Sequence, residues 1–203
     1  MAVPAQVEGQ WYAVHFYHDW PEGRSPLWHR DALLAHEVLL PVLRRYQQAL
    51  PLWRFHRRAA RDAAGHRLRF IFYADKATAQ SIQQALSADP LLRALQQRGW
   101  LKKVRHAGFG KQAQRLSATS DPHWSPAVQA AWPHFIMGVS RTWLELIAAE
   151  VGPLAWISDL DALDQGYKEV DAQVSQTWRD QGQHAFFHHL SAVYGYKALE
   201  VRY

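Results

Sequence analysis

The sequence contains no cysteine and only two methionines among its 203 residues. The absence of cysteine excludes disulfide bonds, iron–sulfur clusters, thiolate zinc sites and a cysteine nucleophile. No segment approaches the roughly 18 consecutive apolar residues that a membrane-spanning helix needs. The N-terminal residues MAVPAQVEGQ also lack the basic and apolar parts of a signal peptide. We therefore expect a soluble, cytoplasmic protein without a membrane partner.

Acidic residues are scarce in the first part of the chain. Residues 1–120 hold 18 Lys and Arg against 8 Asp and Glu, whereas residues 121–203 hold 5 against 10. Arginine outnumbers lysine by 17 to 6, which favours forked recognition of carboxylate or phosphate groups, with high-GC codon usage as the alternative explanation. We expect residues 1–120 to form a basic sheet domain and residues 121–203 a helical half packed against it, together one compact unit.

The periodicity of the apolar residues predicts the fold class, because 48% of the chain is hydrophobic and can form a sizeable core. Strands are predicted over residues 11–18, 53–58, 66–73 and 100–106. Helices are predicted over residues 29–50, 75–86, 89–98, 126–151, 160–178 and 184–194, with a kink or a break at Pro41 in the first of them. Asp75, Asp89 and Ser125 are predicted to be N-caps. Residues 107–124 are predicted to be a loop, and residues 198–203 a short strand or an ordered end. The fold class is α+β: a small, mostly antiparallel sheet with helices on one face, followed by a helical C-terminal half.

The predicted hairpin carries the strongest concentration of charge. Residues 54–69 contain six arginines and two histidines but a single acid, Asp62. Strand alternation separates an apolar face from a basic face, the latter made of Arg54, His56, Arg58, Arg67 and Arg69. Such a face can bind an acidic substrate or a phosphate backbone, or it can be a solvated surface on which arginine stems cover their neighbours. Nearby aromatic residues alternate onto the apolar face, which argues against a stacking platform for single-stranded nucleic acid.

Three further groups of residues have a structural and a functional interpretation. Lys102, Lys103, Arg105 and His106 either extend the basic field or protect an edge strand from pairing. His184 and His188 lie one helical turn apart, but the zincin motif is absent, so we expect helix packing rather than a metal ligand. The aspartates at 159, 161 and 164 are expected to complement a helix dipole, and Trp132 and Trp143 to lie in the core. We predict no metal and no cofactor.

The first 75 residues resemble a known family. An aromatic strand over residues 11–17 is followed by Leu39-Leu-Pro-Val-Leu43, then by Trp53-Arg-Phe-His-Arg57 and Gly65-His-Arg-Leu-Arg-Phe70. This order is similar to the C-terminal elimination domain of class I lanthipeptide dehydratases, which also occurs as stand-alone thiopeptide-type bacteriocin biosynthesis proteins. The resemblance covers about a third of the chain.

The resemblance implies a tailoring protein of bacterial ribosomal peptide biosynthesis. Its activity would be of the lyase type, with glutamate eliminated from a glutamylated Ser or Thr of a peptide substrate, and a partner enzyme would take part. Arg67 and Arg69 would then hold a carboxylate or a leader peptide, with Arg57 beside them. Elimination needs a base and an acid, for which His66, His56 and His15 are the candidates. The alternative is a non-catalytic module whose basic face, formed with Arg54 and Arg58, binds RNA or an acidic protein.

Overall fold

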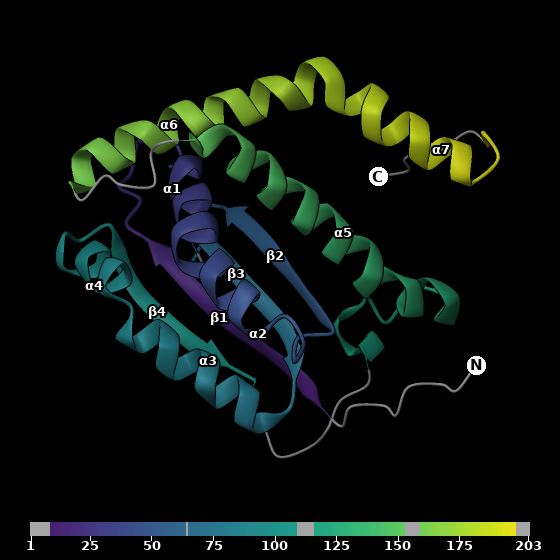
Figure 1. The fold of residues 1–203 in the computed structure, drawn as a ribbon, viewed down its shortest axis with the longest axis horizontal. Coiled ribbons are helices and arrows are strands. Elements are labelled where there is room, and N and C mark those ends of the chain that lie inside the picture. Colours follow the sequence, from purple (N-terminus) through teal and green to yellow (C-terminus); the bar gives the residue numbers. More distant parts are fainter. Residues whose placement is uncertain (1–8, 64, 109–115, 153–158, 198–203) are drawn as a thin grey trace.

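The computed structural model describes residues 9–63, 65–108, 116–152 and 159–197 (Figure 1). Its strands are β1 (Gln10–His18), β2 (Leu52–Ala59), β3 (His66–Ala74) and β4 (Leu101–Ala107). The helices of the first part are α1 (Trp28–Leu33), the π-helical η1 (Leu34–Leu39), α2 (Leu40–Tyr46), α3 (Lys76–Ala88) and α4 (Pro90–Gln97). The 3-10 helix η2 (Leu116–Thr119) precedes α5 (Pro126–Val151), α6 (Leu160–Thr177), the π-helical η4 (Trp178–His188) and α7 (His189–Val193). The predicted α+β class is confirmed.

The four strands form one antiparallel sheet in the order β2-β3-β1-β4. The chain order is strand, helix, strand, strand, helices, strand, which is the split β-α-β arrangement of ferredoxin-like domains. β1 and β3 are therefore the central strands, and each carries one side chain in two to each face of the sheet. Every cross-strand pair shares a face, so the register decides which functional side chains meet.

One face of the sheet is covered by α1, η1, α2, α3 and α4 (Figure 1). The alternating residues of the central strands supply its core, which includes Tyr12, Val14, Phe16, Leu68, Phe70 and Phe72. The caps that the sequence predicts at the helix starts are confirmed, because Asp75 accepts a hydrogen bond from the Thr78 amide and Asp89 accepts one from the Leu92 amide. The π-helical turn η1 stands immediately before α2, which has Pro41 in its first turn. The chain therefore continues through Pro41 without the predicted break.

The helical half lies against one edge and one end of the sheet domain. Helix α5 runs beside the edge strand β2, where the Ser140 hydroxyl accepts a hydrogen bond from the Phe55 amide at 3.0 Å. Helix α6 packs on α1, and Asp164 of α6 accepts hydrogen bonds from His29 at 3.0 Å and from Arg30 at 2.8 Å. None of the described helices is long and apolar enough to cross a membrane.

Two predictions for the helical half are wrong. The separate helix expected over 184–194 is the continuation of α6 through η4 into α7, so the three form one long arm (Figure 1). Trp132 and Trp143 of α5, expected in the core, are only half-buried, and Phe135 and Val139 of the same helix are 47% and 48% exposed. They are exposed because the arm diverges from the N-terminal half of α5. The predicted tail at 198–203 lies outside the described residues.

Candidate functional site

The open face of the sheet carries a group of basic and aromatic side chains, which we call the basic face. Its members are Arg54, His56 and Arg58 of β2, Arg67 and Arg69 of β3, His15 and Tyr17 of β1, and Lys103 and Arg105 of β4. The basic face predicted for the hairpin is confirmed, and the register places His56 opposite Arg69 and Arg58 opposite Arg67. The central strand β1 and the edge strand β4 complete the face, so it spans all four strands.

Two rows of side chains cross the sheet perpendicular to the strands. The first row runs through His56, Arg69, His15 and Arg105, and the second through Arg58, Arg67, Tyr17 and Lys103. Opposite side chains in neighbouring strands lie about 5 Å apart at their Cβ atoms. Each row is therefore a continuous line of donors and rings across the width of the sheet.

The positive charge on the basic face is little compensated. Burial, and then the charges of Arg69, Arg67 and Arg105, lower the pKa of His15 to about 4. Burial and the same two arginines of β3 also lower the pKa of His56. Both imidazoles are therefore neutral at pH 7, because protonation of either one would place a further positive charge beside the arginines.

The guanidinium groups on the central strand have unused donors. The Nε atoms of Arg67 and Arg69 are buried and have no hydrogen-bond partner among the described residues. Arg58, by contrast, is paired with Asp62 of the hairpin turn, and Arg54 donates to the Thr119 hydroxyl at 2.9 Å. The two arginines of β3 are thus the part of the face with the most capacity to bind an anion.

The other end of the open face is apolar and covered. Trp11, Leu52, Ile71 and Tyr73 form a second small core there, against which Met137 of α5 packs. This cover leaves the basic end of the sheet as the part that faces outward.

A second cluster lies on the covered face, at the end of the sheet where β1 ends and β3 begins. Asp31 of α1 is fully buried and accepts hydrogen bonds from His18 Nε2 at 2.7 Å, Arg57 Nε at 3.0 Å and His66 Nε2 at 3.4 Å. Burial alone would raise the pKa of Asp31, but the hydrogen bonds from both histidines outweigh it and the net shift is downward. Burial lowers the pKa of His18 despite its carboxylate partner. The cluster is thus a buried carboxylate with one arginine and two histidines around it.

Arg57 is held in this cluster by aromatic rings as well as by charge. Its guanidinium carbon lies 5.0 Å from the centre of the Trp28 ring and 4.7 Å from that of Trp143. It also donates to the Trp28 carbonyl at 2.9 Å and lies 3.6 Å from Asp171 of α6. Arg57 therefore joins the sheet, α1 and the helical half, and it is not a free anion-binding group.

A polar cavity of about 560 Å³ opens beside the cluster. His18 and His66 form its inner wall, and Tyr17, Trp20, Arg61 and Lys102 contribute to its rim. Both Nδ1 atoms of the two histidines are buried and have no hydrogen-bond partner among the described residues. The buried imidazoles therefore border a space that water and small polar ligands can enter.

The structure thus divides the residues that the sequence singled out. Arg54, His56, Arg58, Arg67, Arg69 and His15 lie on the basic face. Arg57 and His66 alternate onto the opposite face and belong to the buried cluster, so Arg57 does not lie beside Arg67 and Arg69. The three candidate catalytic histidines consequently do not share one site.

Three residues of these sites, His18, Asp31 and Tyr17, were not predicted from the sequence. His18 and Asp31 were not singled out, although a lone carboxylate directly before the apolar run Ala32-Leu33-Leu34-Ala35 is a signal of a buried charge. The expectation that aromatic rings avoid the basic face is correct for the hairpin but wrong for β1. That strand places Tyr17 there, stacked on His15 at a ring distance of 6.0 Å.

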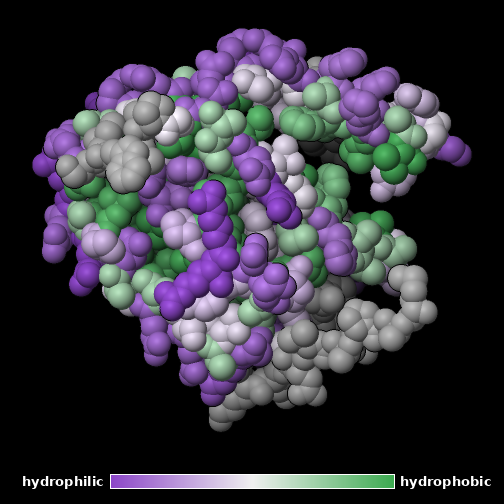
Figure 2. All heavy atoms as spheres, viewed as in Figure 1, coloured by the Kyte–Doolittle hydropathy of each residue, from purple (hydrophilic) through white to green (hydrophobic). Residues whose placement is uncertain are grey.

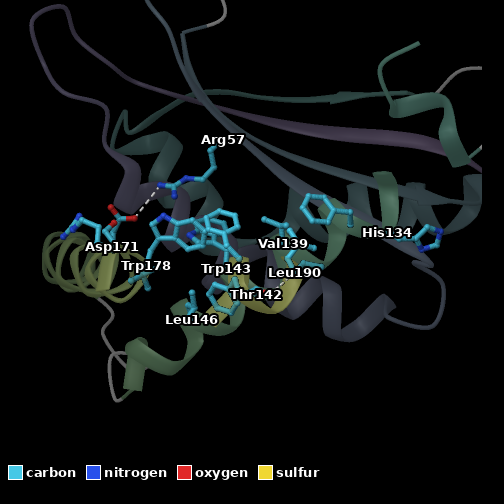
Figure 3. Close-up of a pocket in the computed structure, with 16 residues that line it drawn as sticks. Arg57, His134, Val139, Thr142, Trp143, Leu146, Asp171, Trp178 and Leu190 are labelled. Carbon is cyan, nitrogen blue, oxygen red and sulfur yellow. Dashed lines mark hydrogen bonds and ion pairs between the residues drawn. The ribbon is translucent and has the colours of Figure 1, made fainter. Parts of the chain in front are cut away.

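A third feature is an apolar cleft between α5 and the arm formed by α6, η4 and α7. Figure 2 shows apolar side chains on both sides of this hollow, whose volume is about 730 Å³. Figure 3 shows Trp143, Val139 and Leu190 along it, with Arg57 and Asp171 paired at one end. The lining suits an apolar group and lies away from the basic face.

The remaining motifs have structural explanations. Asp159 caps α6 by accepting a hydrogen bond from the Ala162 amide, and Asp161 pairs with Arg98 on the surface. The His184 and His188 rings stack on each other at 5.2 Å.

Comparisons with protein-family models, with curated proteins and with solved structures found no match. A function therefore has to come from the chemistry of the sites themselves.

Proposed function

We propose that the protein binds single-stranded nucleic acid, and RNA in particular, on the basic face. The observation that carries this proposal is the pair of rows that cross all four strands with arginine or lysine on β2, β3 and β4. Phosphate backbones are bound mainly by such arrays of arginine and lysine. Arg67 and Arg69 are half-buried at the centre of the array and have no ion pair among the described residues, so their guanidinium groups are available to phosphate oxygens.

The aromatic pair on β1 favours RNA over an acidic protein partner. His15 and Tyr17 stack with an interplanar angle of 17°, and each lies opposite an arginine of β3. Four-stranded sheets that bind RNA stack bases on aromatic side chains of their central strands. Because the pKa of His15 is about 4, its ring is neutral at pH 7 and offers a π-face rather than another charge. An acidic peptide would use the arginines but has no need of these rings.

Binding of a fluorescein-labelled oligouridine, followed by anisotropy over a series of salt concentrations, tests the proposal. Each phosphate contact contributes about 0.7 to the slope of log K against log salt for a single strand. The double variant Arg67→Ala/Arg69→Ala is therefore expected to lower the slope by about 1.4. Arg44→Ala is the matched control, because Arg44 is an exposed arginine of α2 on the opposite side of the sheet.

Tyr17→Ala separates base stacking from simple attraction between charges. It is expected to weaken oligouridine binding at least about fivefold, in line with about 1–3 kcal/mol per stacked base, and to leave the salt slope unchanged. Polyglutamate is the competitor that represents an acidic protein partner. Displacement of RNA by equal charge concentrations of polyglutamate, or equal weakening by Arg44→Ala, would contradict the proposal.

The second candidate function is the peptide tailoring that the resemblance implies. One observation favours it: His56 and His15 flank Arg69 from the two neighbouring strands, so two neutral imidazoles lie beside a carboxylate-binding group. In an elimination, a neutral imidazole would take the α-proton, a Cα=Cβ double bond would form, and the Cβ–O bond would break, so that glutamate leaves as a carboxylate that keeps the former side-chain oxygen. His66 and Arg57 have no part in this version, because they lie on the other face.

A synthetic peptide that carries O-glutamyl serine tests the second candidate by mass spectrometry. The expected product is the dehydroalanine peptide plus free glutamate, formed by the protein and lost in Arg69→Ala and in His15→Gln. An unchanged peptide mass over prolonged incubation at pH 7 would exclude this activity.

A further inference from the structure

The buried cluster of His18, Asp31 and His66 has the composition of a metal site. Among the described residues, these three are the group whose imidazole nitrogens and carboxylate oxygens all lie within 4.8 Å of one another. They come from three different elements, β1, α1 and β3. Two of these elements, β1 and β3, are the central strands of the sheet, which are paired on both sides.

The distances are close to those that an ion requires. With metal–ligand bonds of about 2.0–2.2 Å, two ligand atoms of a tetrahedral zinc site lie about 3.3 Å apart. The distance from Asp31 Oδ2 to His66 Nε2 is 3.4 Å, and that from Oδ1 to His18 Nε2 is 2.7 Å. The two distances end on the two oxygens of one carboxylate, so Asp31 presents one oxygen to each imidazole.

The polar cavity gives small ligands access to the cluster. His18 and His66 line this cavity of about 560 Å³, so a bound ion would have a coordination position facing it. Three protein ligands and one open position are typical of catalytic rather than structural zinc sites. Two histidines and one carboxylate also suit other imidazole-preferring first-row divalent ions.

Residues next to the three ligands hold them in position. Arg57 donates to Asp31 Oδ2 at 3.0 Å and so orients the carboxylate while leaving Oδ1 to face His18. The Trp28 ring packs edge-on against His66 at a ring distance of 4.9 Å and limits the rotation of this imidazole.

We propose that His18, Asp31 and His66 bind one divalent transition-metal ion of the zinc type, with an open coordination position toward the polar cavity. The three ligands lie on the opposite face of the sheet from the basic face, although Tyr17 of the basic face also lines the polar cavity. The competing explanation is a metal-free hydrogen-bond network that only ties α1 to the sheet.

The test is metal binding to the full chain, purified in the presence of a chelator and then dialysed against Zn²⁺ or Co²⁺. We expect one ion per chain and, for Co²⁺, visible absorption of the intensity that four- or five-coordinate ions show. His18→Gln and His66→Gln are each expected to weaken binding at least tenfold. The control is the double variant His184→Gln/His188→Gln, which removes the exposed histidine pair of η4 and should leave the stoichiometry unchanged.

The test does not depend on the folding of the variants. The wild-type chain with Co²⁺ then answers the question, because imidazole nitrogen ligands to the ion can be detected by X-ray absorption. Absence of any tightly bound ion in the wild-type chain would overturn the proposal, as would binding that only the His184 and His188 control abolishes. Oligouridine binding that is unchanged by chelator would show that the two sites are independent.

Discussion

Replacing Asp31 by asparagine is the most informative single perturbation of the fold. Asparagine has nearly the same shape, but it removes the buried negative charge that His18, His66 and Arg57 share. Asp31 is 0% exposed and the Arg57 side chain is 27% exposed, so the guanidinium would lose its nearest carboxylate in a region with little water. Breaking a buried pair by removing one partner costs about 3–5 kcal/mol. This is a large share of the roughly 5–15 kcal/mol that stabilises a typical protein.

Urea unfolding followed by tryptophan fluorescence measures this loss, since the chain has ten tryptophans. The buffer should contain a chelator, so that loss of a metal ion does not add to the result. Asp161→Asn is the control: it removes a carboxylate that also pairs with an arginine, Arg98, but with side chains 67% and 52% exposed. We expect the control to lose less than about 1 kcal/mol. A loss for Asp31→Asn of the same size as the control, at an unchanged m-value, would refute the reasoning.

Two further predictions concern the edge strand and the basic face. Ser140→Ala is expected to lower the free energy of unfolding by about 1–3 kcal/mol, because the buried amide of Phe55 loses its acceptor. Urea unfolding measures this loss. The control, Ser140→Thr, keeps the hydroxyl and should retain most of the stability. For His15, the folded pKa of about 4 lies below the ordinary histidine value of 6.5, so the unfolded chain takes up a proton first as the pH falls. Its contribution to stability is complete above about pH 6.5 and is lost toward pH 4. His15→Gln should therefore lose less stability than the wild-type chain between pH 7 and pH 4.5, and an identical pH dependence would contradict the assigned shift.

Neighbouring residues of β1 and β3 belong to different sites. On β1, His15 and Tyr17 point to the basic face while Phe16 and His18 point to the core. On β3, Arg67 and Arg69 share the basic face while His66 points to the core. Adjacent residues thus serve different sites, because the side-chain period of a strand is two. A substitution at one position therefore tests one site without removing the neighbouring one.

Local sequence signals were sufficient for much of the fold. Period-two alternation predicted the hairpin and its basic face, and the register adds that Arg58 lies opposite Arg67. The caps at Asp75, Asp89 and Ser125 were also predicted correctly, since an N-cap depends only on a side chain and the amide three residues ahead. The same alternation separates Arg57 from Arg58, although the resemblance groups Arg57 with the arginines of the basic face.

Tertiary structure alone decided the rest. His18 and His66 meet at Asp31 across separations of 13 and 35 residues, and a one-dimensional pattern contains no information on which distant side chains converge. The exposure of Phe135 also depends on where the arm lies, since an apolar stripe on a helix indicates burial only if another element packs against it. The sequence by itself determined the antiparallel sheet and its basic face, because both follow from local periodicity and charge. The buried carboxylate cluster and the apolar cleft arose only when the chain packed, because both depend on contacts between elements far apart in the sequence.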